Sequence, residues 1–483
     1  MFQQIPNIQH IKWLILCLIT LHACNTDTTT ETSETTIKTT QTTTKTTETT
    51  KTTKTKIPKE VTFAEHIAPI IHQNCTPCHR PNEAGPFYLR TYEEVAKHAR
   101  MIQYVTSIGF MPPWPADPNY RSFAGERSLT EHEKQLIKAW VRGGWKEGDQ
   151  SKTPPIPEYP EGSQLGKPDM VIKMPEKYKI TGNSEDKFLT MKIPYELPKD
   201  TFVKIIEFVP NNRKLVHHVN GHLLAFDSDK KEKINEGQWV VDAYKHGSRK
   251  DLYQELGILH DDGSYPEVIP LVSNYLPGVV AQEYPQGIGG WQMKQKGAIV
   301  MNDIHYGPTP IDDFDQSYFN VFFAKEPPKR PTLELQLGTL GISDIVPPLV
   351  VPADSVKTFR TKAKVLGDIS LLTVNPHMHL LGKDFLAFAV TPQNDTIPLV
   401  KIPEWDFRWQ YFYTFKNMLK LPKGSIIYVE ATFDNTAENP NNPYSPPRVV
   451  TERDGSMRTT DEMLQLIITF VPYEAGDELI SLE

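Results

Sequence analysis

The sequence predicts a multidomain chain in which a small all-α domain precedes two all-β domains. Its 483 residues correspond to about three domains at roughly 150 residues each. Residues 59–150 hold two helix-start signals followed by apolar residues at helical spacing. From residue 165 onward, short apolar runs alternate with proline, asparagine and glycine, which is typical of antiparallel sandwiches. The 41 prolines argue against long uninterrupted helices over most of the chain.

Composition and charge exclude two broad classes of protein. Lysine and arginine number 52 against 59 acidic residues, so the formal net charge is −7. Such a chain lacks the positive charge with which nucleic-acid-binding proteins neutralise phosphates. Only one apolar run is long enough to consider as membrane-inserting, which excludes a polytopic membrane protein.

Residues 1–23 have the pattern of a bacterial signal peptide. The apolar stretch Trp13–Leu21 is too short to span a bilayer as a mature helix, but it suits a signal-peptide core. It runs into Leu21-His22-Ala23-Cys24, which resembles the lipobox, where the cysteine is lipidated and becomes the new N-terminus. The alternative is an ordinary signal peptide with a chance cysteine. We expect lipidation of Cys24, and the Asn25 that follows favours the outer membrane.

Residues 24–58 are predicted to form a disordered tether. Threonine fills 19 of the 30 positions of Thr26–Thr55, and the acidic and basic residues between them cancel. Such a segment cannot bury enough apolar surface to offset the entropy of ordering. A lipid anchor and a tether predict an extracytoplasmic lipoprotein, on the periplasmic side or at the cell surface. After processing only Cys75 and Cys78 remain, so no structural disulfide is expected.

Those two cysteines lie in Cys75-Thr76-Pro77-Cys78-His79, the C-x-x-C-H pattern of covalent c-type haem attachment. Two thiols about one helical turn apart bond the vinyl groups of the haem, and the adjacent His79 becomes the proximal iron ligand. Redox dithiols and zinc sites also use C-x-x-C, but the following histidine and the lack of a second cysteine pair disfavour both. We therefore expect residues 59–150 to form a cytochrome c-like domain that carries one haem c.

The flanking sequence agrees with a small helical domain. Capping boxes at Thr62–Glu65 and Thr130–Glu133 predict two helix starts. Before the second of these helices, Met111 lies on a proline-stiffened loop and resembles the distal sulfur ligand of class I cytochromes c. Met101 and His98 are the competing sixth ligands, and Met111 could instead be a core residue.

A proline-rich linker, residues 151–164, separates this region from the β-rich part, which we divide at residues 165–330 and 331–483. Aromatic residues alternate with other residues over Trp405–Tyr413, which predicts a strand with one aromatic face. Eight of the 15 histidines lie beyond residue 164, and five of these form three compact motifs. The motifs are Val216-His217-His218, Ile304-His305-Tyr306 and Pro376-His377-Met378-His379.

The spacing within these motifs suits metal binding. In an H-x-H on a strand both imidazoles project from one face and can reach one ion. Adjacent histidines point to opposite faces of a regular strand, so a shared metal requires a twist or bulge there. Taken alone, each motif is more often a hydrogen-bonded structural feature.

Together and in this order, the motifs resemble the copper type II, ascorbate-dependent monooxygenases, the peptidylglycine α-hydroxylating and dopamine β-monooxygenase family. The resemblance covers nearly all of residues 165–483 and also includes Trp405-Asp406-Phe407, Phe433-Asp434-Asn435 and Thr460-Asp461-Glu462-Met463. It implies two jelly-roll sandwiches that face each other across an open cleft, with one copper ion on each. The implied electron-transfer copper site consists of His217, His218 and His305. The implied oxygen-binding, catalytic copper site consists of His377, His379 and Met463.

The implied ligand sets make chemical sense. Three imidazoles form a borderline site, for which zinc is the natural competitor of copper. Two imidazoles and a thioether favour Cu(I) and disfavour zinc. His222 is a rival third ligand near His218, whereas His246 and His260 are expected to be surface or structural residues. The family's animal members are rich in disulfides, but this chain has no cysteine after Cys78. No substrate-holding residues could be matched, so the resemblance carries over no substrate class.

These features predict an oxidoreductase, a copper monooxygenase that hydroxylates a small-molecule or peptide-like substrate with dioxygen. The fused haem, re-reduced by an external electron donor, would supply or relay the two electrons that monooxygenation requires. A non-catalytic haem and copper electron-transfer or copper-holding lipoprotein is the first alternative. A zinc hydrolase that uses the three-histidine site is the second.

Overall fold

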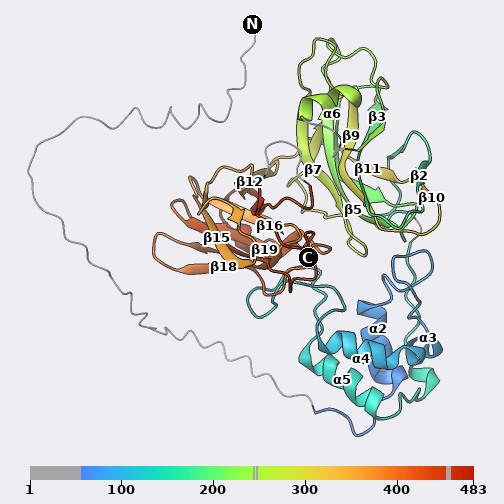
Figure 1. Ribbon diagram of the computed structural model, residues 1–483. Coiled ribbons are helices and arrows are strands. Elements are labelled where there is room, and N and C mark those ends of the chain that lie inside the picture. The colour runs from blue at the N-terminus through green and yellow to red at the C-terminus, as the bar shows by residue number, and fades with distance from the viewer. Residues whose placement is uncertain (1–55, 161, 243–244, 246–247, 453–457) are drawn as a thin grey trace, which may run out of the picture. The chain divides into compact units, whose positions relative to one another are not determined.

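A computed structural model describes residues 56–483 except 161, 243–244, 246–247 and 453–457. The predicted signal peptide, Cys24, Asn25 and nearly all of the predicted tether lie outside these described residues. All the described residues belong to one compact unit (Figure 1). This unit is mostly β, with sheets arranged as sandwiches, and most of its helices come early in the chain. None of its helices has the length and apolar composition that crossing a bilayer requires.

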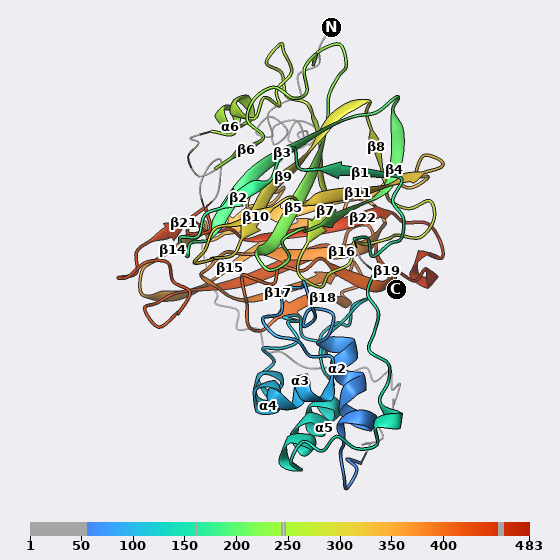
Figure 2. The same ribbon diagram turned by 90° about the vertical axis from the view of Figure 1, so that its right-hand side faces the viewer.

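Helices occupy the region where the sequence predicts the haem domain, and Figure 2 shows them gathered together. They are η1 (Phe63–Ile67), α2 (Ala68–Asn74), α3 (Tyr92–Lys97), α4 (Ala99–Ser107), α5 (Glu131–Arg142) and the short η2 (Gln150–Lys152). Their apolar faces share one core that includes Phe63, Ile71, Val95 and Trp140. Amphipathic spacing therefore accounts for their packing.

Both predicted helix starts are confirmed, because η1 follows Thr62 and α5 follows Thr130, but only one of the two capping boxes forms. The capping box at Thr130–Glu133 is confirmed, because each side chain accepts a hydrogen bond from the backbone amide of the other residue. The capping box at Thr62–Glu65 is wrong. That helix opens with a π-helical turn, the threonine makes no side-chain cap, and its amide and hydroxyl both contact Nδ1 of His66. The glutamate instead pairs with Lys152 at 2.7 Å.

Residues 170–324 form a first sandwich. Its five-stranded antiparallel sheet has the order β6-β3-β9-β5-β7, and its four-stranded sheet has the order β1-β11-β4-β8. The first sheet consists of β6 (Val240–Val241), β3 (Lys187–Glu196), β9 (Lys296–Tyr306), β5 (Val216–Ala225) and β7 (Glu267–Tyr275). The second consists of β1 (Met170–Lys173), β11 (Tyr318–Ala324), β4 (Thr201–Val209) and β8 (Trp291–Met293). A small pair, β2 (Tyr178–Ile180) and β10 (Asp313–Asp315), and the helix α6 (Arg249–Glu255) complete this part.

One core joins the inner faces of these two sheets. It takes Met191 from β3, Val219 from β5 and Met301 from β9 on one side, and Val203 and Phe319 from β4 and β11 on the other. Side chains of alternate strand residues point inward, as the two-residue period of a strand requires. One face of β5 and β9 is therefore buried in this core, and the opposite face is left for other contacts.

Residues 333–472 form a second sandwich, whose sheets have the orders β12-β22-β16-β19 and β13-β15-β20-β17-β18. The first sheet consists of β12 (Leu333–Gly338), β22 (Gln465–Pro472), β16 (Ile369–His377) and β19 (Tyr413–Leu421). The second consists of β13 (Ile345–Val346), β15 (Ser355–Lys364), β20 (Ile426–Asn435), β17 (Gly382–Val390) and β18 (Thr396–Ile402). The pair β14 (Val350–Val351) and β21 (Val450–Thr451), and η4 (Asp477–Leu479), complete it. The sequence boundary at 330/331 falls between β11 and β12.

The strand predicted over Trp405–Tyr413 is wrong. β18 ends at Ile402 and β19 begins at Tyr413, so residues 403–412 are a loop, which we call the aromatic loop. A turn closed by the amide of Trp409 and the main-chain oxygen of Asp406 interrupts extended backbone there. The aromatic residues are nevertheless inside, since Trp405 is 8% and Tyr411 4% exposed. Burial, rather than a pleated strand, therefore explains the aromatic pattern.

Candidate metal centres and haem-attachment site

His217, His218 and His305 come together on the first sandwich. One ligand nitrogen from each lies within 4.8 Å of those of the other two. His218 and His305 face each other across β5 and β9, with ring centroids 5.0 Å apart, and the His217 centroid lies 4.9 Å from that of His305. The strand register shifts between Val216 and His218 and again between His218 and Gly221. This irregularity is the bulge that two adjacent histidines need in order to share one ion.

The electrostatics at His217 favour a neutral imidazole, the form that binds metal. Burial, and then the neighbouring imidazoles of His218 and His305, lower the pKa of His217 to about 3. His305 is 7% exposed, and its Nε2 lies 2.6 Å from a carboxylate oxygen of Asp186. Its ring stacks on Phe188 at a centroid distance of 4.2 Å and an angle of 13°. Carboxylate and aromatic contacts of this kind fix the orientation of a ligating imidazole.

The rival histidines are placed elsewhere. Nδ1 of His222 accepts a hydrogen bond from the amide of Leu271, and burial lowers the pKa of His222 to about 4. His222 is not part of the three-histidine cluster. His260 is 5% exposed and bonds to the amide of Asp227 and the hydroxyl of Ser264, which is a structural role. His246 lies outside the described residues.

His377 and His379 come together on the second sandwich, with ring centroids 5.1 Å apart and planes at 88°. His377 is the last residue of β16, whereas His379 lies just beyond the strand, so only the first is a strand residue as the motif predicts. Nδ1 of His379 donates to the main-chain oxygen of Asp461 at 2.9 Å, and Nδ1 of His377 hydrogen-bonds the side-chain oxygen of Gln410. Both rings therefore have their Nε2 atoms as the candidate ligand atoms.

Met463 belongs to the segment that lies along this histidine pair. The carboxylate of the preceding Glu462 accepts from the amides of His379, Leu381 and Met463 at 3.0, 2.7 and 3.3 Å. These bonds hold the backbone of residues 461–463 against the H-x-H turn. The Met463 side chain is buried, at 7% exposure. Burial raises the pKa of Glu462 to about 8, against the effect of its amide donors.

Both centres have donor sets that suit copper. The first offers three imidazole nitrogens that already lie close together. The second offers two imidazoles in contact, and the buried Met463 follows Glu462, whose carboxylate binds the amide of His379. Zinc also accepts three imidazoles, so geometry alone does not choose between the two ions at the first centre. A thioether ligand from Met463 would favour Cu(I) over zinc at the second.

The C-x-x-C-H segment follows directly from α2, which ends at Asn74. Nδ1 of His79 donates to the main-chain oxygen of Phe87 at 3.0 Å, so Nε2 is the atom available to iron. A Cβ at Gly85 would lie 2.8 Å from the His79 ring, so glycine is needed where the chain passes this imidazole. Burial raises the pKa of the Cys75 thiol to about 12, which disfavours a thiolate-based redox role. The arrangement suits the predicted proximal ligand.

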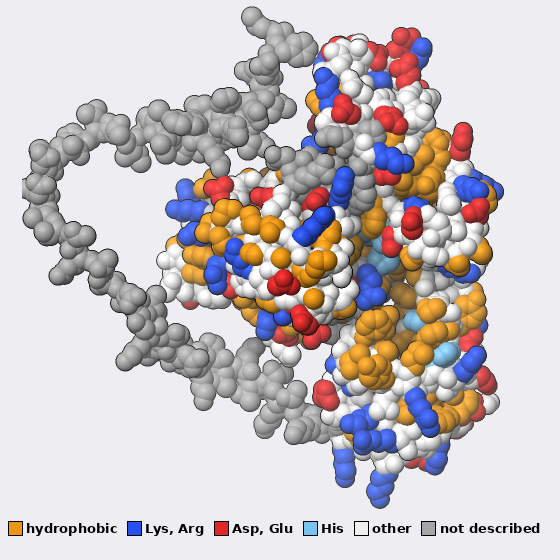
Figure 3. Space-filling view, viewed as in Figure 1, with side chains coloured by type: hydrophobic (Ala, Val, Ile, Leu, Met, Phe, Trp, Pro, Cys, Tyr) orange, Lys and Arg blue, Asp and Glu red, His pale blue; other side chains and the backbone are white. Residues whose placement is uncertain are grey.

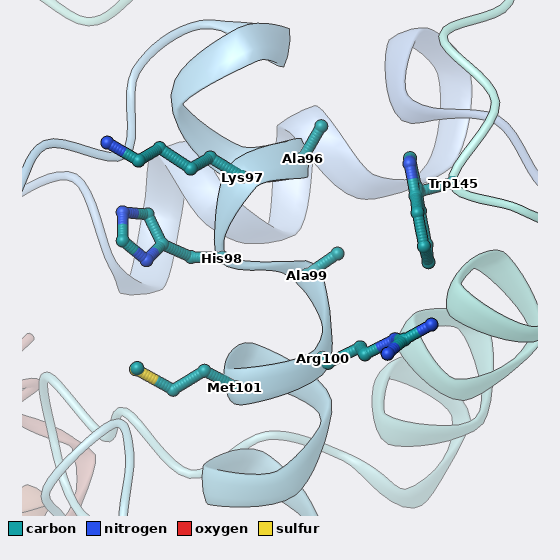
Figure 4. Close-up of a pocket in the computed structure, with 7 residues that line it drawn as sticks. All are labelled: Ala96, Lys97, His98, Ala99, Arg100, Met101 and Trp145. Carbon is teal, nitrogen blue, oxygen red and sulfur yellow. The ribbon is translucent and has the colours of Figure 1, made fainter.

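The candidates for the sixth ligand lie in different places. Met111 is partly buried on the loop before α5, and Met101 is 51% exposed on α4. The His98 ring stacks on Phe87 at a centroid distance of 4.0 Å. Figure 4 shows the side chains of His98 and Met101 projecting to the same side of the α3–α4 junction, away from Trp145.

Large apolar side chains are exposed on the helical region. Figure 3 shows hydrophobic side chains exposed over the helical region. The large exposed ones are Tyr88, Met101, Tyr104, Ile108 and Phe110. Three of these occupy one face of α4 or its end, at the spacing of a helix face that packs against something apolar.

Comparisons with known proteins assign this chain to no family. No family model and no curated protein matches the chain. Among solved structures, it is similar to the infectious bursal disease virus VP2 subviral particle, at 7% identity over 66% of this chain and 76% of that chain, with a TM-score of 0.17. It is also similar to infectious bursal disease virus Gx strain, at 8% identity over 68% and 78% of the two chains, with a TM-score of 0.17. Likenesses this weak carry no argument about fold or function.

Three residues that support the candidate ligands were not predicted from the sequence. Asp186, Gln410 and Glu462 each hold a candidate ligand by its ring or by its backbone. Asp186 is 119 residues from His305, so no local sequence pattern predicts their contact. Glu462 lies next to Met463 inside a motif that the resemblance had singled out, and this position was the available signal.

Proposed function

We propose that this chain is a copper-dependent monooxygenase that resembles the peptidylglycine α-hydroxylating and dopamine β-monooxygenase family, with a fused c-type haem as its electron source. The observation that carries the proposal is the convergence of His217, His218 and His305 at the bulge of β5 against β9. The His377/His379 pair on the second sandwich supports it, because the family's chemistry requires two separate copper sites. The two sandwiches are proposed to be jelly rolls.

The proposed reaction inserts one oxygen atom of dioxygen into a C–H bond and releases the other as water, so it consumes two electrons and two protons. Copper at the two sites would cycle between Cu(I) and Cu(II), and a haem c on Cys75 and Cys78 would pass single electrons. The protein's own part is to orient the ligand rings. Asp186, Gln410 and the main-chain oxygen of Asp461 do so by holding one nitrogen of a ligand ring each.

The remaining parts of the proposal concern location and partners. Lipidation at Cys24 would anchor the protein outside the cytoplasm, on the outer membrane, where a tether lets the folded unit reach soluble substrates. The substrate would be a small molecule or a peptide-like compound, and an external one-electron donor would re-reduce the haem. Nucleic acid is not expected as a partner, because the net charge is −7.

Metal and haem content of the full chain, exported to a periplasm that attaches haem c, tests the proposal. We expect two copper ions and one haem per chain, and loss of the covalent haem in Cys75→Ser/Cys78→Ser. His305→Ala should lose the copper of the first site, and Met463→Leu should weaken Cu(I) binding at the second. Met418→Leu is the matched control, since Met418 is a fully buried methionine of the same sandwich that is 1% exposed.

Other outcomes separate the alternatives. Zinc at the first site, with the second site empty, would replace the proposal with a zinc hydrolase. Two coppers and a haem, with no oxygen consumption alongside any of a broad set of C–H donors, would favour the non-catalytic electron-transfer lipoprotein.

A further inference from the structure

The aromatic loop, residues 403–412, contacts both candidate metal centres. The Trp409 ring lies 6.0 Å from the His217 ring, centroid to centroid. The Phe407 ring lies 5.9 Å from that of His379, and Gln410 hydrogen-bonds His377. One short segment of the second sandwich thus reaches the first centre with one side chain and the second with two.

The same loop also contacts the helical region. The hydroxyl of Tyr411 donates to the main-chain oxygen of Pro113 at 2.9 Å, and the Tyr411 ring lies 5.3 Å from Trp114. The guanidinium of Arg408 lies 5.5 Å from the Phe110 ring. These partners belong to residues 110–114, the loop that carries Met111. The contact is therefore with a segment already predicted to reach the haem.

Three aromatic side chains form a continuous series between that loop and the first metal centre. Trp114 lies 5.3 Å from Tyr411, and Tyr411 stacks on Trp409 at 6.2 Å with an angle of 12° between the rings. Trp409 then lies 6.0 Å from His217. Tyr411 is 4% exposed and Trp114 and Trp409 are partly buried, so little water separates these rings. Centroid separations of this size are those of rings in direct contact.

The haem-attachment cysteine lies near the same series. Burial raises the pKa of Tyr411 well above its ordinary value, and the side chains of Arg127 and Cys78 act on it electrostatically. The Cys78 thiol is therefore within electrostatic range of the Tyr411 hydroxyl. Tyr411 is thus in direct contact with the Met111 loop, and its hydroxyl is influenced by the charge of Cys78.

We propose that Trp114, Tyr411 and Trp409 carry electrons from the haem to the metal centre of His217, His218 and His305. This inference rests on the proposed function. In each transfer one electron leaves Fe(II) and arrives at Cu(II), which gives Fe(III) and Cu(I), and an external one-electron reductant restores the Fe(II). No proton moves with the electron, because the Tyr411 hydroxyl donates to a main-chain carbonyl, which is not a base that could take its proton.

The experiment measures haem oxidation directly, without substrate or dioxygen. The full chain, loaded with haem and copper, is reduced at the haem by a flash-generated one-electron donor while the copper is Cu(II), and the haem absorbance is followed. Trp409→Leu should slow the copper-dependent oxidation about tenfold or more, equivalent to about 1.4 kcal/mol of activation free energy. Trp409→Phe, which keeps a ring, should slow it less.

The matched control is Trp239→Leu. Trp239 is also partly buried but contacts Tyr178 in the first sandwich, at 6.3 Å, rather than a histidine. Copper content, the Cu(II) electron paramagnetic resonance spectrum and the haem potential are measured in every variant. If Trp409→Leu disturbs the His217 centre, Trp114→Leu and Tyr411→Leu test the same series at its two earlier members.

The outcomes are distinct. Unchanged haem oxidation in Trp114→Leu, Tyr411→Leu and Trp409→Leu, with copper and potentials intact, overturns the series as the route and leaves the proposed function standing. Equal slowing in the Trp239 control also overturns it. If the wild-type haem is not oxidised by its own Cu(II) at all, the haem-to-copper part of the proposed function is the statement that fails.

Discussion

The Nδ1 atom of His379 donates a hydrogen bond to the main-chain oxygen of Asp461, 82 residues further along the chain. This bond joins the H-x-H turn to the segment that ends in Met463. It also fixes the tautomer of the imidazole, since the proton must be on Nδ1 and the lone pair on Nε2. The second candidate centre is therefore preorganised by backbone contacts as well as by its ligand side chains.

Glu462 is expected to be the main support of this arrangement. Its carboxylate accepts three backbone amides from both segments. Glu462→Ala should lower the free energy of unfolding by about 1–3 kcal/mol for each buried amide left unpaired. Denaturant unfolding of the metal-free protein measures this loss, and a chelator competition measures the accompanying fall in Cu(I) affinity.

Glu430→Ala provides the control for that variant. Glu430 belongs to the same sandwich but pairs with Arg360 at the surface, where both side chains are exposed. Its loss should cost less than about 1 kcal/mol. Equal effects of the two substitutions would contradict the role assigned to Glu462.

Asp186 is expected to tune the first centre through His305. Asp186→Asn keeps the shape of the side chain but removes the charge that accepts the imidazole N–H, and such supporting contacts typically change metal affinity by about 10–100-fold. Copper competition titration should show this loss at the three-histidine site and no change at the second site. Glu185→Gln is the matched control, because its carboxylate pairs with Lys187 and is exposed. A loss of the same size at both copper sites would argue for a general destabilisation instead.

The sequence predicted the candidate ligand residues better than it predicted the residues that orient them. The requirement that His217 and His218 share one ion predicted a backbone irregularity there, and the register of β5 against β9 has one. Asp186 and Gln410 are common residue types that lie 119 and 33 positions from His305 and His377. Their contacts with these histidines can therefore be recognised only in the folded chain. The identity of the bound metal stays a prediction.

The errors in secondary structure have local causes. Alternating aromatic residues over 405–413 predicted a strand, but the turn from Asp406 to Trp409 breaks the pleat while leaving Trp405, Tyr411 and Tyr413 buried. A period-two pattern indicates that alternate side chains are buried. An irregular loop packed between other segments can bury alternate side chains as well. The start of η1 after Thr62 was predicted correctly, but its capping box was not, because a π-helical turn changes which side chain can reach the first amides.

Glu83 and Arg213 are expected to couple the haem-attachment segment to the loop that leads into His217. The Glu83 carboxylate is 5% exposed and lies 2.6 Å from Arg80 and 3.2 Å from Arg213. A double-mutant cycle with Glu83→Gln and Arg213→Gln should give a coupling free energy of about 0.5–3 kcal/mol in denaturant unfolding. The exposed pair Lys204–Glu283 serves as the comparison, with a coupling below about 1 kcal/mol. No coupling between Glu83 and Arg213 would show that this contact does not hold the two segments together.

Lys192 is expected to make stability depend on pH in the alkaline range. Its side chain is 1% exposed and donates to the main-chain oxygen of Glu236, and burial lowers its pKa from 10.5 to about 8. Between these values the folded chain has lost the proton and the unfolded chain keeps it, so stability rises as pH rises from about 8 to about 10.5. Denaturant unfolding across this range should show the rise in the wild type and a smaller one in Lys192→Met. Lys204→Met, which removes an exposed lysine, should leave the slope as in the wild type, and an unchanged slope in Lys192→Met would mean that Lys192 titrates normally.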